Sequence, residues 1–211
     1  DSHNADNNFI EINQNSHRSK SESLNSSNQA FNIPRKEDKL QSFKVWDCCS
    51  GAGGKSISFQ IQFEQHFKRV NPLIKQVLFQ SNWICSDVRQ TIVNNLKKRY
   101  KLLGLIQPKA IQLNLLDDSF ECSDSNILEC NLIIADLPCT GSGTWRRTAE
   151  ELLKEISVKD FANRQYQIIK NVLKIKSSQG NSDTYYIYYM TCSILAMENE
   201  QNIELLLENH S

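Results

Sequence analysis

From Phe43 onward, short apolar runs alternate with stretches of helical periodicity, and this alternation is the feature that most constrains the fold. Five runs predict β-strands because they are short, apolar and bounded by turn residues. They are residues 43–49, 82–87, 110–115, 131–136 and 184–190. Strands that alternate with helices and are apolar along most of their length are typical of a parallel sheet covered on both faces. We therefore expect an α/β fold with a mostly parallel sheet and helices on both faces.

The segments between and after these runs carry apolar residues at helical spacing and predict helices. They are residues 55–68, 88–103, 149–156, 158–175 and 198–208. Residues 1–42 differ, because they are rich in Asn, Ser, Lys and Glu and hold few large apolar side chains. We expect them to form a polar, loosely structured leader with a short strand at 9–12. A single domain then spans residues 43–211.

Charge and cysteine content narrow the class of protein. Lys plus Arg and Asp plus Glu each number 24, and this balance argues against a domain that coats nucleic acid but not against an enzyme that binds it with one face. The seven cysteines are odd in number and irregularly spaced, which favours a reducing, cytoplasmic setting. No C-x-x-C pair is present and the histidines lie far from the cysteines, so no metal site is predicted. No apolar run approaches about 18 residues, so no membrane span is predicted.

Parallel sheets bind ligands at the carboxyl ends of their strands, and chemically useful residues collect at that edge in this sequence. In chain order they are the glycine-rich turn at 50–54, Asp87, Asn114, Asp136, Cys139 and Cys192. One edge of the predicted sheet therefore gathers glycines, carboxylates and two thiols.

Each of these features has a plainer alternative when it is taken alone. The glycine turn matches neither G-x-x-x-x-G-K-[ST] nor G-x-G-x-x-G, so it either approaches a ligand closely or is only a tight connection. Asp87 is suited to accept the hydroxyls of a ribose, but also to cap the helix that follows. Asn114 suits an adenine edge or an ordinary turn. A single cysteine is more often buried packing, whereas two at adjacent strand ends beside an acid favour nucleophilic chemistry.

Four motifs in order along residues 43–208 carry a resemblance to a known family. They are residues 45–56 (VWDCCSGAGGKS), 86–89 (SDVR), 135–147 (ADLPCTGSGTWRR) and 191–193 (TCS), the last followed by 198–200 (ENE). The chain resembles the Nol/Nop/Sun family of RNA (cytosine-5)-methyltransferases. That family shares the Pro-Cys loop around Cys139 with DNA cytosine-5 methyltransferases, whereas the Thr-Cys-Ser motif around Cys192 is its own. The presence of both motifs points to RNA.

The resemblance implies a Rossmann-like, S-adenosylmethionine-dependent methyltransferase fold and a set of site residues. Cys192 is implied as the nucleophile, Cys139 as the residue that assists product release, Asp136 as the contact to the cytosine edge and Lys55 as electrostatic support. The implied contacts to the cofactor S-adenosylmethionine are Cys49, Ser50, Gly51, Ala52, Gly53, Gly54, Lys55, Asp87, Asn114 and Asp136. The implied substrate is RNA, either rRNA or tRNA.

Several basic residues are candidates for contact with RNA phosphates. We expect Arg146 and Arg147 to make such contacts. The cluster at 97–99 could do the same, but a solvated helix face explains it equally well.

The chain departs from the family pattern in two residues, in an apparent insertion between 68 and 81, and in extent. Ala52 stands where the family usually has Pro, and Asn114 stands where an acid is common. The family carries an RNA-binding region before the core and further strands after it, so the resemblance implies a core that is incomplete at its C-terminal end. Two other functions stay open: a DNA cytosine-5 methyltransferase that uses Cys139, and a non-catalytic relative that binds RNA or cofactor.

Overall fold

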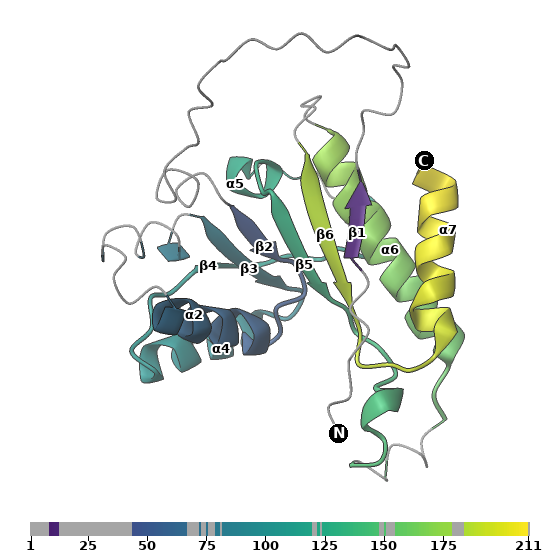
Figure 1. Ribbon diagram of the computed structural model, residues 1–211, viewed down its shortest axis with the longest axis horizontal. Coiled ribbons are helices and arrows are strands. Elements are labelled where there is room, and N and C mark those ends of the chain that lie inside the picture. Colours follow the sequence, from purple (N-terminus) through teal and green to yellow (C-terminus); the bar gives the residue numbers. More distant parts are fainter. Residues whose placement is uncertain are drawn as a thin grey trace, which may run out of the picture.

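The computed structural model describes residues 9–12, 44–66, 72, 75, 79–80, 82–119, 122, 124–147, 150, 155–178 and 184–210. Within these residues, six strands form one sheet in the order β1-β6-β5-β2-β3-β4 (Figure 1). They are β1 (Phe9–Ile12), β2 (Val45–Asp47), β3 (Trp83–Asp87), β4 (Lys109–Gln112), β5 (Leu132–Asp136) and β6 (Tyr185–Met190). Strands β2 to β6 run parallel and β1 pairs antiparallel with β6. The predicted mostly parallel α/β sheet is confirmed, and so is the short strand at 9–12.

Helices cover both faces of the sheet, as predicted (Figure 1). They are α2 (Gly54–His66), α4 (Gln90–Leu102), the short α5 (Ser125–Leu128), α6 (Val158–Ser177) and α7 (Glu200–His210), with 3₁₀ turns η1 (Ser142–Thr144) and η3 (Ala196–Glu198). Val45 and Trp46 are neighbours in β2 but pack into different hydrophobic clusters on the two faces of the sheet. Both are fully buried, but Val45 packs in the cluster under α2 and α4, whereas Trp46 packs in the cluster under α6. Successive strand residues point to opposite faces, so a strand covered on both sides is apolar along most of its length.

The order of the strands reverses beside β2, and this reversal positions the site. The chain runs from β2 outward to β3 and β4, and then returns to place β5 on the other side of β2, followed by β6. In sheets of this kind, the connections after the two strands at the reversal diverge and leave a crevice at the carboxyl edge. The segments that follow β2 and β5 therefore flank a natural binding position.

Several predicted boundaries change for local reasons. Helix α4 begins at Gln90 rather than at 88, because Arg89 is extended (φ −98°, ψ 111°) and occupies the N-cap position. Asp87 is therefore not the helix cap, and that alternative is wrong. Strand β4 ends at Gln112 rather than at 115, because Asn114 Oδ1 accepts a hydrogen bond from the Leu116 N–H and closes a turn. Helix α7 begins at Glu200 rather than at 198.

Two predicted segments lie largely outside the described residues. Of the leader at 1–42, only β1 is described. Of the helix predicted over 149–156, only 150, 155 and 156 are described, and 155 and 156 are not helical. The division of the chain at residue 42 therefore stays a prediction.

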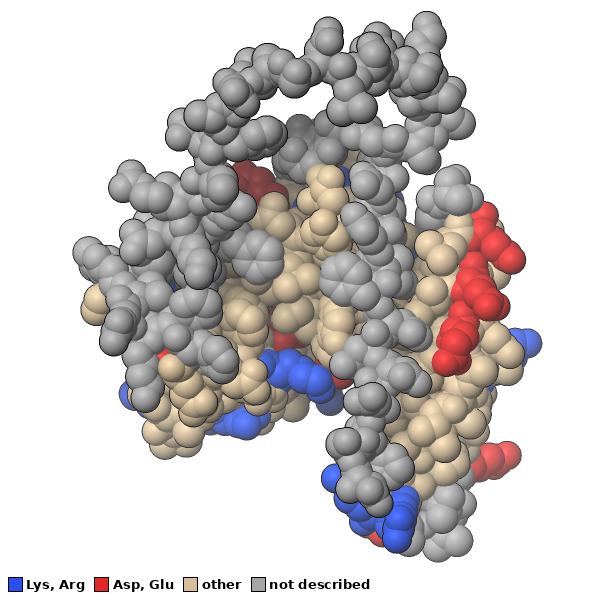
Figure 2. Space-filling view, viewed as in Figure 1, with Lys and Arg blue, Asp and Glu red and all other residues tan. Residues whose placement is uncertain are grey.

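The surface of the described part carries its acidic residues unevenly. Glu200, Glu204 and Glu208 are exposed and four residues apart, so they share one face of α7, where Figure 2 shows an acidic stripe. No helix in the described ranges is long and apolar enough to cross a bilayer.

Candidate active site

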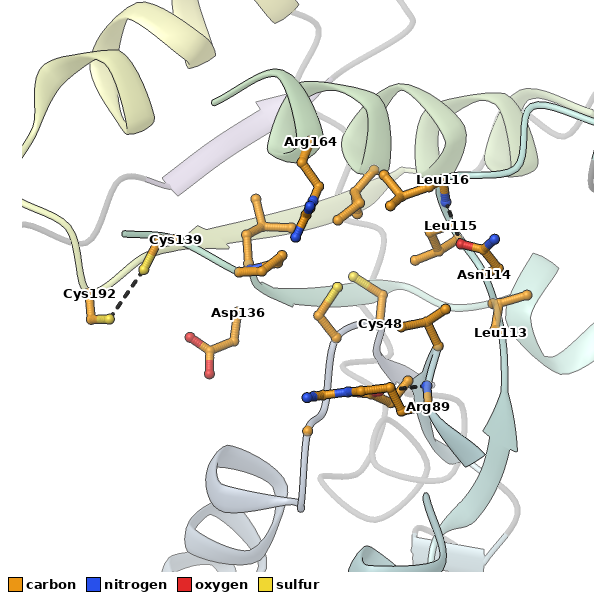
Figure 3. A pocket seen from close by; sticks show the side chains of 17 residues that line it. Cys48, Arg89, Leu113, Asn114, Leu115, Leu116, Asp136, Cys139, Arg164 and Cys192 are labelled. Atoms are coloured by element: carbon orange, nitrogen blue, oxygen red, sulfur yellow. Dashed lines mark hydrogen bonds and ion pairs between the residues drawn. The ribbon is translucent and has the colours of Figure 1, made fainter. Parts of the chain in front are cut away.

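A cavity of about 510 Å³ opens at the carboxyl edge of the sheet, between the segments that follow β2 and β5 (Figure 3). Its volume is within the range of about 300–1,000 Å³ that is usual for small-molecule sites. Its lining consists of Cys48, Cys49, Gly51, Asp87, Val88, Arg89, Leu113, Asn114, Leu115, Leu116, Asp136, Leu137, Pro138, Cys139, Arg164, Ile168 and Cys192. Sequence reasoning had singled out Cys49, Gly51, Asp87, Asn114, Asp136, Cys139 and Cys192 among these.

Two thiols meet at one end of the cavity. Cys139 follows β5, Cys192 follows the neighbouring β6, and their Sγ atoms are 3.2 Å apart (Figure 3). Cys139 is partly buried, whereas Cys192 is exposed. Burial, followed by the hydrogen bond with Cys192, raises the pKa of the Cys139 thiol to about 12. Cys139 therefore stays protonated at neutral pH, and Cys192 is the thiol that a ligand reaches from outside.

A carboxylate and an amine lie beside the thiols. Asp136 is the last residue of β5, and its carboxyl group lies on the cavity side facing the two cysteines (Figure 3). Lys55, in the first turn of α2, places its Nζ 2.9 Å from Asp136 Oδ2. Both side chains are more than one-third exposed, so this ion pair adds little to stability. Its consequence is positional, because it fixes the orientation of the Asp136 carboxylate in the cavity.

Most of the glycine turn packs against neighbouring elements and does not line the cavity. Gly51 and Gly53 have φ values of +52° and +85°, a region that favours glycine. A Cβ on Gly53 would also lie 3.2 Å from Leu96 Cγ, so the packing of α4 against this turn depends on glycine there. Arg99 Nη1 donates to the Ala52 carbonyl at 2.6 Å and fixes the tip of the turn to α4. Of the cofactor contacts predicted at 49–55, only Cys49 and Gly51 line the cavity, whereas Ser50, Ala52, Gly53, Gly54 and Lys55 lie outside its lining.

The opposite end of the cavity combines a buried carboxylate with apolar walls. Asp87 is only 7% exposed, and its Oδ1 accepts hydrogen bonds from Arg89 N (2.9 Å) and Arg89 Nε (3.0 Å). The hydrogen bond to Asp87 raises the pKa of the Arg89 guanidinium. Val88, Leu113 and Leu115 supply apolar surface here. Asn114 is exposed and lies at the rim, with its side chain in the turn to Leu116.

A second buried acid lies beneath the glycine turn and does not line the cavity. Asp47 ends β2 and is fully buried; its Oδ2 accepts from Ser56 Oγ at 2.5 Å. Its Oδ1 has no hydrogen-bond partner within the described part of the chain. Burial outweighs the Ser56 hydrogen bond and raises the pKa of Asp47 to about 7.

We expect Asp47 to make the protein less stable as the pH rises from about 4 to about 7. In this window the folded state holds a proton on Asp47 that the unfolded state has released, so the free energy of unfolding falls with pH. Each pKa unit corresponds to about 1.4 kcal/mol, so the loss is on the order of 4 kcal/mol. Urea unfolding at about pH 5 and about pH 8 should capture roughly 3 kcal/mol of this loss, because part of it lies below pH 5. Asp47→Asn should lack this component and the exposed control Glu204→Gln should keep it; equal pH dependence in all three proteins would contradict the prediction.

Residues 34–211 match the family described as 16S rRNA methyltransferase RsmB/F. The chain belongs to this family. It is 27% identical over 168 residues to the "Probable ribosomal RNA small subunit methyltransferase B" of Coxiella burnetii, covering 79% of this chain and 34% of that protein. It is 24% identical over 170 residues to the "Ribosomal RNA small subunit methyltransferase B" of Yersinia enterocolitica, covering 80% of this chain and 34% of that protein. The chain thus spans about one third of the length of these curated relatives.

Solved structures share the fold of this RsmB/F chain. PH0851 superposes with a TM-score of 0.59 at 20% identity, covering 83% of this chain and 36% of that one. NSun6 from Pyrococcus horikoshii, solved with SFG, superposes with a TM-score of 0.53 at 18% identity, covering 82% of this chain and 40% of that one. The predicted Rossmann-like methyltransferase fold and the predicted family are confirmed.

The RsmB/F core brings together only part of the predicted site. Cys192, Cys139, Asp136 and Lys55 converge. Arg146 and Arg147 are exposed and lie outside the cavity lining, so their contact with RNA stays a prediction. Of the basic cluster at 97–99, Arg99 is already bonded to the glycine turn. The described residues contain no group of three or more His, Cys, Asp or Glu that could hold a metal ion.

Sequence reasoning missed Arg164, which extends from α6 into the cavity (Figure 3). Its guanidinium lies 5.6 Å from the Phe161 ring, and no carboxylate of the described residues forms an ion pair with it. Ile168, four residues later, lines the same cavity. Residues four apart share a helix face, so helical spacing could have indicated that Arg164 is on the cavity side of α6.

Proposed function

We propose that this chain transfers a methyl group from S-adenosylmethionine to carbon 5 of a cytosine in RNA. The observation that carries the proposal is the pair of thiols 3.2 Å apart, with the Asp136 carboxylate beside them in one cavity. Membership of the RsmB/F family and the names of the curated relatives favour ribosomal RNA as the substrate. A ribosomal RNA substrate in turn favours a cytoplasmic protein. The acidic stripe on α7 would repel phosphates, so we expect RNA to approach from the cavity mouth.

The far end of the cavity fits the adenosine part of the cofactor. Asp87 lies at the end of β3, where a carboxylate accepts the hydroxyls of a bound ribose. Arg89, whose side chain is 62% exposed, is free to turn away from Asp87 and release its oxygens. Val88, Leu113 and Leu115 provide an apolar slot for an adenine ring. When bound, S-adenosylmethionine supplies an electrophilic methyl group, and the thiol end of the cavity is where a cytosine would meet it.

Cys192 is the proposed nucleophile because it is the exposed thiol of the pair. Its thiolate forms a bond to carbon 6 of cytosine, and the electron pair of the 5,6 double bond makes carbon 5 nucleophilic. After carbon 5 has taken the methyl group, its proton passes to a water-derived base. The electron pair that is left restores the 5,6 double bond and expels Cys192 as the thiolate. The cytosine must leave its stack for this attack, so a single-stranded or loop position is expected.

Asp136 and Cys139 serve the same ring in different ways. The Asp136 carboxylate accepts hydrogen bonds from the amino edge of cytosine and favours the ring protonated at nitrogen 3, which draws electrons from carbon 6. Lys55 keeps that carboxylate oriented. Cys139, protonated at neutral pH and in contact with the Cys192 sulfur, can give a proton to the departing thiolate and so assist product release.

The same geometry weighs against a DNA methyltransferase that uses Cys139. Such an enzyme would need Cys139 as a thiolate, but the partial burial of Cys139 raises the pKa of its thiol and favours the protonated form. The non-catalytic alternative has no observation in its favour, since the thiols, the carboxylate and the cavity are all present together.

Methyl transfer to defined RNA tests the proposal. The protein is incubated with methyl-labelled S-adenosylmethionine and small-subunit ribosomal RNA that lacks this modification, with a DNA of the same sequence as the comparison. We expect label in RNA alone, recovered as 5-methylcytidine in a nucleoside digest. Label in DNA would favour the Cys139 alternative, and cofactor binding without transfer to any RNA would favour a binding role.

A further inference from the structure

Glu198 is a buried carboxylate between the two cysteine loops, and the proposed chemistry leaves it without a role. It ends η3, has no exposed surface and does not line the cavity. A charged group in such a place is costly unless its oxygens find partners. Its partners therefore indicate why it is there.

Four hydrogen-bond donors converge on this carboxylate. Its Oε1 accepts from Thr140 N and Gln165 Nε2, both at 2.9 Å. Its Oε2 accepts from Thr140 Oγ1 at 2.6 Å and from Ser193 Oγ at 2.5 Å. An ionised carboxylate only accepts hydrogen bonds and has room for about four, so these donors match the charged form.

These donors are the immediate neighbours of the two thiols. Thr140 follows Cys139 directly, and Ser193 follows Cys192 directly. One carboxylate thus holds both loops from behind, on the side away from the cavity. Gln165 adds a third attachment, because its amide also donates to the carbonyl of Pro138 at 3.0 Å, just before Cys139.

A second set of contacts shows how closely the two loops are joined. The Gly143 N–H donates to the Cys192 carbonyl at 2.9 Å, and a Cβ on Gly143 would lie only 2.7 Å from that oxygen. The hydroxyls of Ser142 and Ser193 are 2.9 Å apart. These hydrogen bonds join the two loops directly, and Glu198 joins them from behind, so the thiol separation depends on both sets of contacts.

We propose that Glu198 is a positioning residue that fixes Cys139 and Cys192 at the separation that adduct formation and release require. This inference rests on the roles proposed above for the two thiols. Glu198 acts through Thr140 and Ser193 and touches neither the cavity nor a substrate in it.

Oxidation by diamide measures the thiol separation without RNA or cofactor. The two thiols lose two electrons and two protons, a disulfide forms, and one diamide is reduced to its hydrazine. Glu198→Ala should slow formation of the Cys139–Cys192 disulfide by about tenfold or more. Peptide mass spectrometry measures the disulfide over time. With 5-fluorocytidine RNA and cofactor, it should slow adduct formation by about 30-fold. Cooperative unfolding and cofactor binding within about threefold of wild type show that the variant is folded.

Two milder variants and one control complete the test. Glu198→Gln keeps neutral hydrogen bonds to the loops and should recover part of both rates, and Ser193→Ala removes only one donor and should slow both by a few fold. Glu204→Ala, on the exposed face of α7, should match wild type. A folded Glu198→Ala with wild-type oxidation and adduct rates overturns the proposal. If Glu198→Ala does not fold, wild-type rates in both milder variants overturn it. Failure of RNA methylation alone would contradict the proposed function and leave the oxidation result to decide on Glu198.

Discussion

Cys192→Ala is expected to abolish the covalent adduct with RNA, whereas Cys139→Ala is expected to accumulate it. Cys192 supplies the bond to carbon 6, and no other exposed thiol among the described residues lies beside it. Loss of a covalent nucleophile removes the route that lowers the barrier, so methyl transfer should fall by about 10⁴-fold or more. Cys139 is needed later, when the Cys192 thiolate departs. Its loss should therefore leave RNA bound to the protein even without a modified base.

Denaturing gels separate these outcomes. Wild type, Cys192→Ala and Cys139→Ala are each incubated with S-adenosylmethionine and either natural RNA or RNA that contains 5-azacytidine. Cys130→Ala is a matched control, because Cys130 is a buried thiol that packs in the core and does not line the cavity. An adduct that vanishes with Cys139→Ala and persists with Cys192→Ala would reverse the two roles and support the DNA-type mechanism.

The architecture was predictable because the signals for it are local. Residues such as Val45 and Trp46 are apolar neighbours in one strand, and only a strand covered on both faces buries them both. Once the sheet is parallel, the residues after its strands must share one edge, so the meeting of Cys139, Cys192 and Asp136 follows from their positions in the sequence. The geometry of that edge then agrees with the motif resemblance.

The rest depended on contacts between distant segments. In the sequence, Glu198 lies near the start of a predicted helix, where exposed acidic residues are common. Glu198 is buried because the loops after β5 and β6 and the side of α6 meet around it. No local sequence pattern predicts this meeting. The role of Asp87 was ambiguous for a similar reason, because the backbone of Arg89 decides that α4 begins at Gln90, two residues later than predicted. The need for glycine at 143 arises only from the approach of the Cys192 carbonyl.

Asp136→Asn is expected to slow adduct formation by about 10³-fold with little change in RNA binding. The substitution keeps the size of the side chain but removes the negative charge that favours a cytosine protonated at nitrogen 3. A group that stabilises charge only in the transition state affects the rate far more than ground-state affinity. Lys55 also loses its partner, and an amide rotated toward Lys55 with its oxygen would present its NH₂ to the cytosine amino group, which is the wrong polarity.

Single-turnover adduct formation and RNA affinity, measured separately, test this. Lys55→Gln is the informative comparison, because it leaves the carboxylate in place and removes only the cation that orients it from a partly exposed position. Its effect should be about tenfold. A loss of rate about 100-fold larger for Asp136→Asn than for Lys55→Gln would identify Asp136 as the group that touches the substrate. If Asp136→Asn forms the adduct within about threefold of the wild-type rate, the cytosine edge is recognised by another group. Arg164 is the next candidate because its side chain reaches into the same cavity and forms no ion pair with a carboxylate of the described residues.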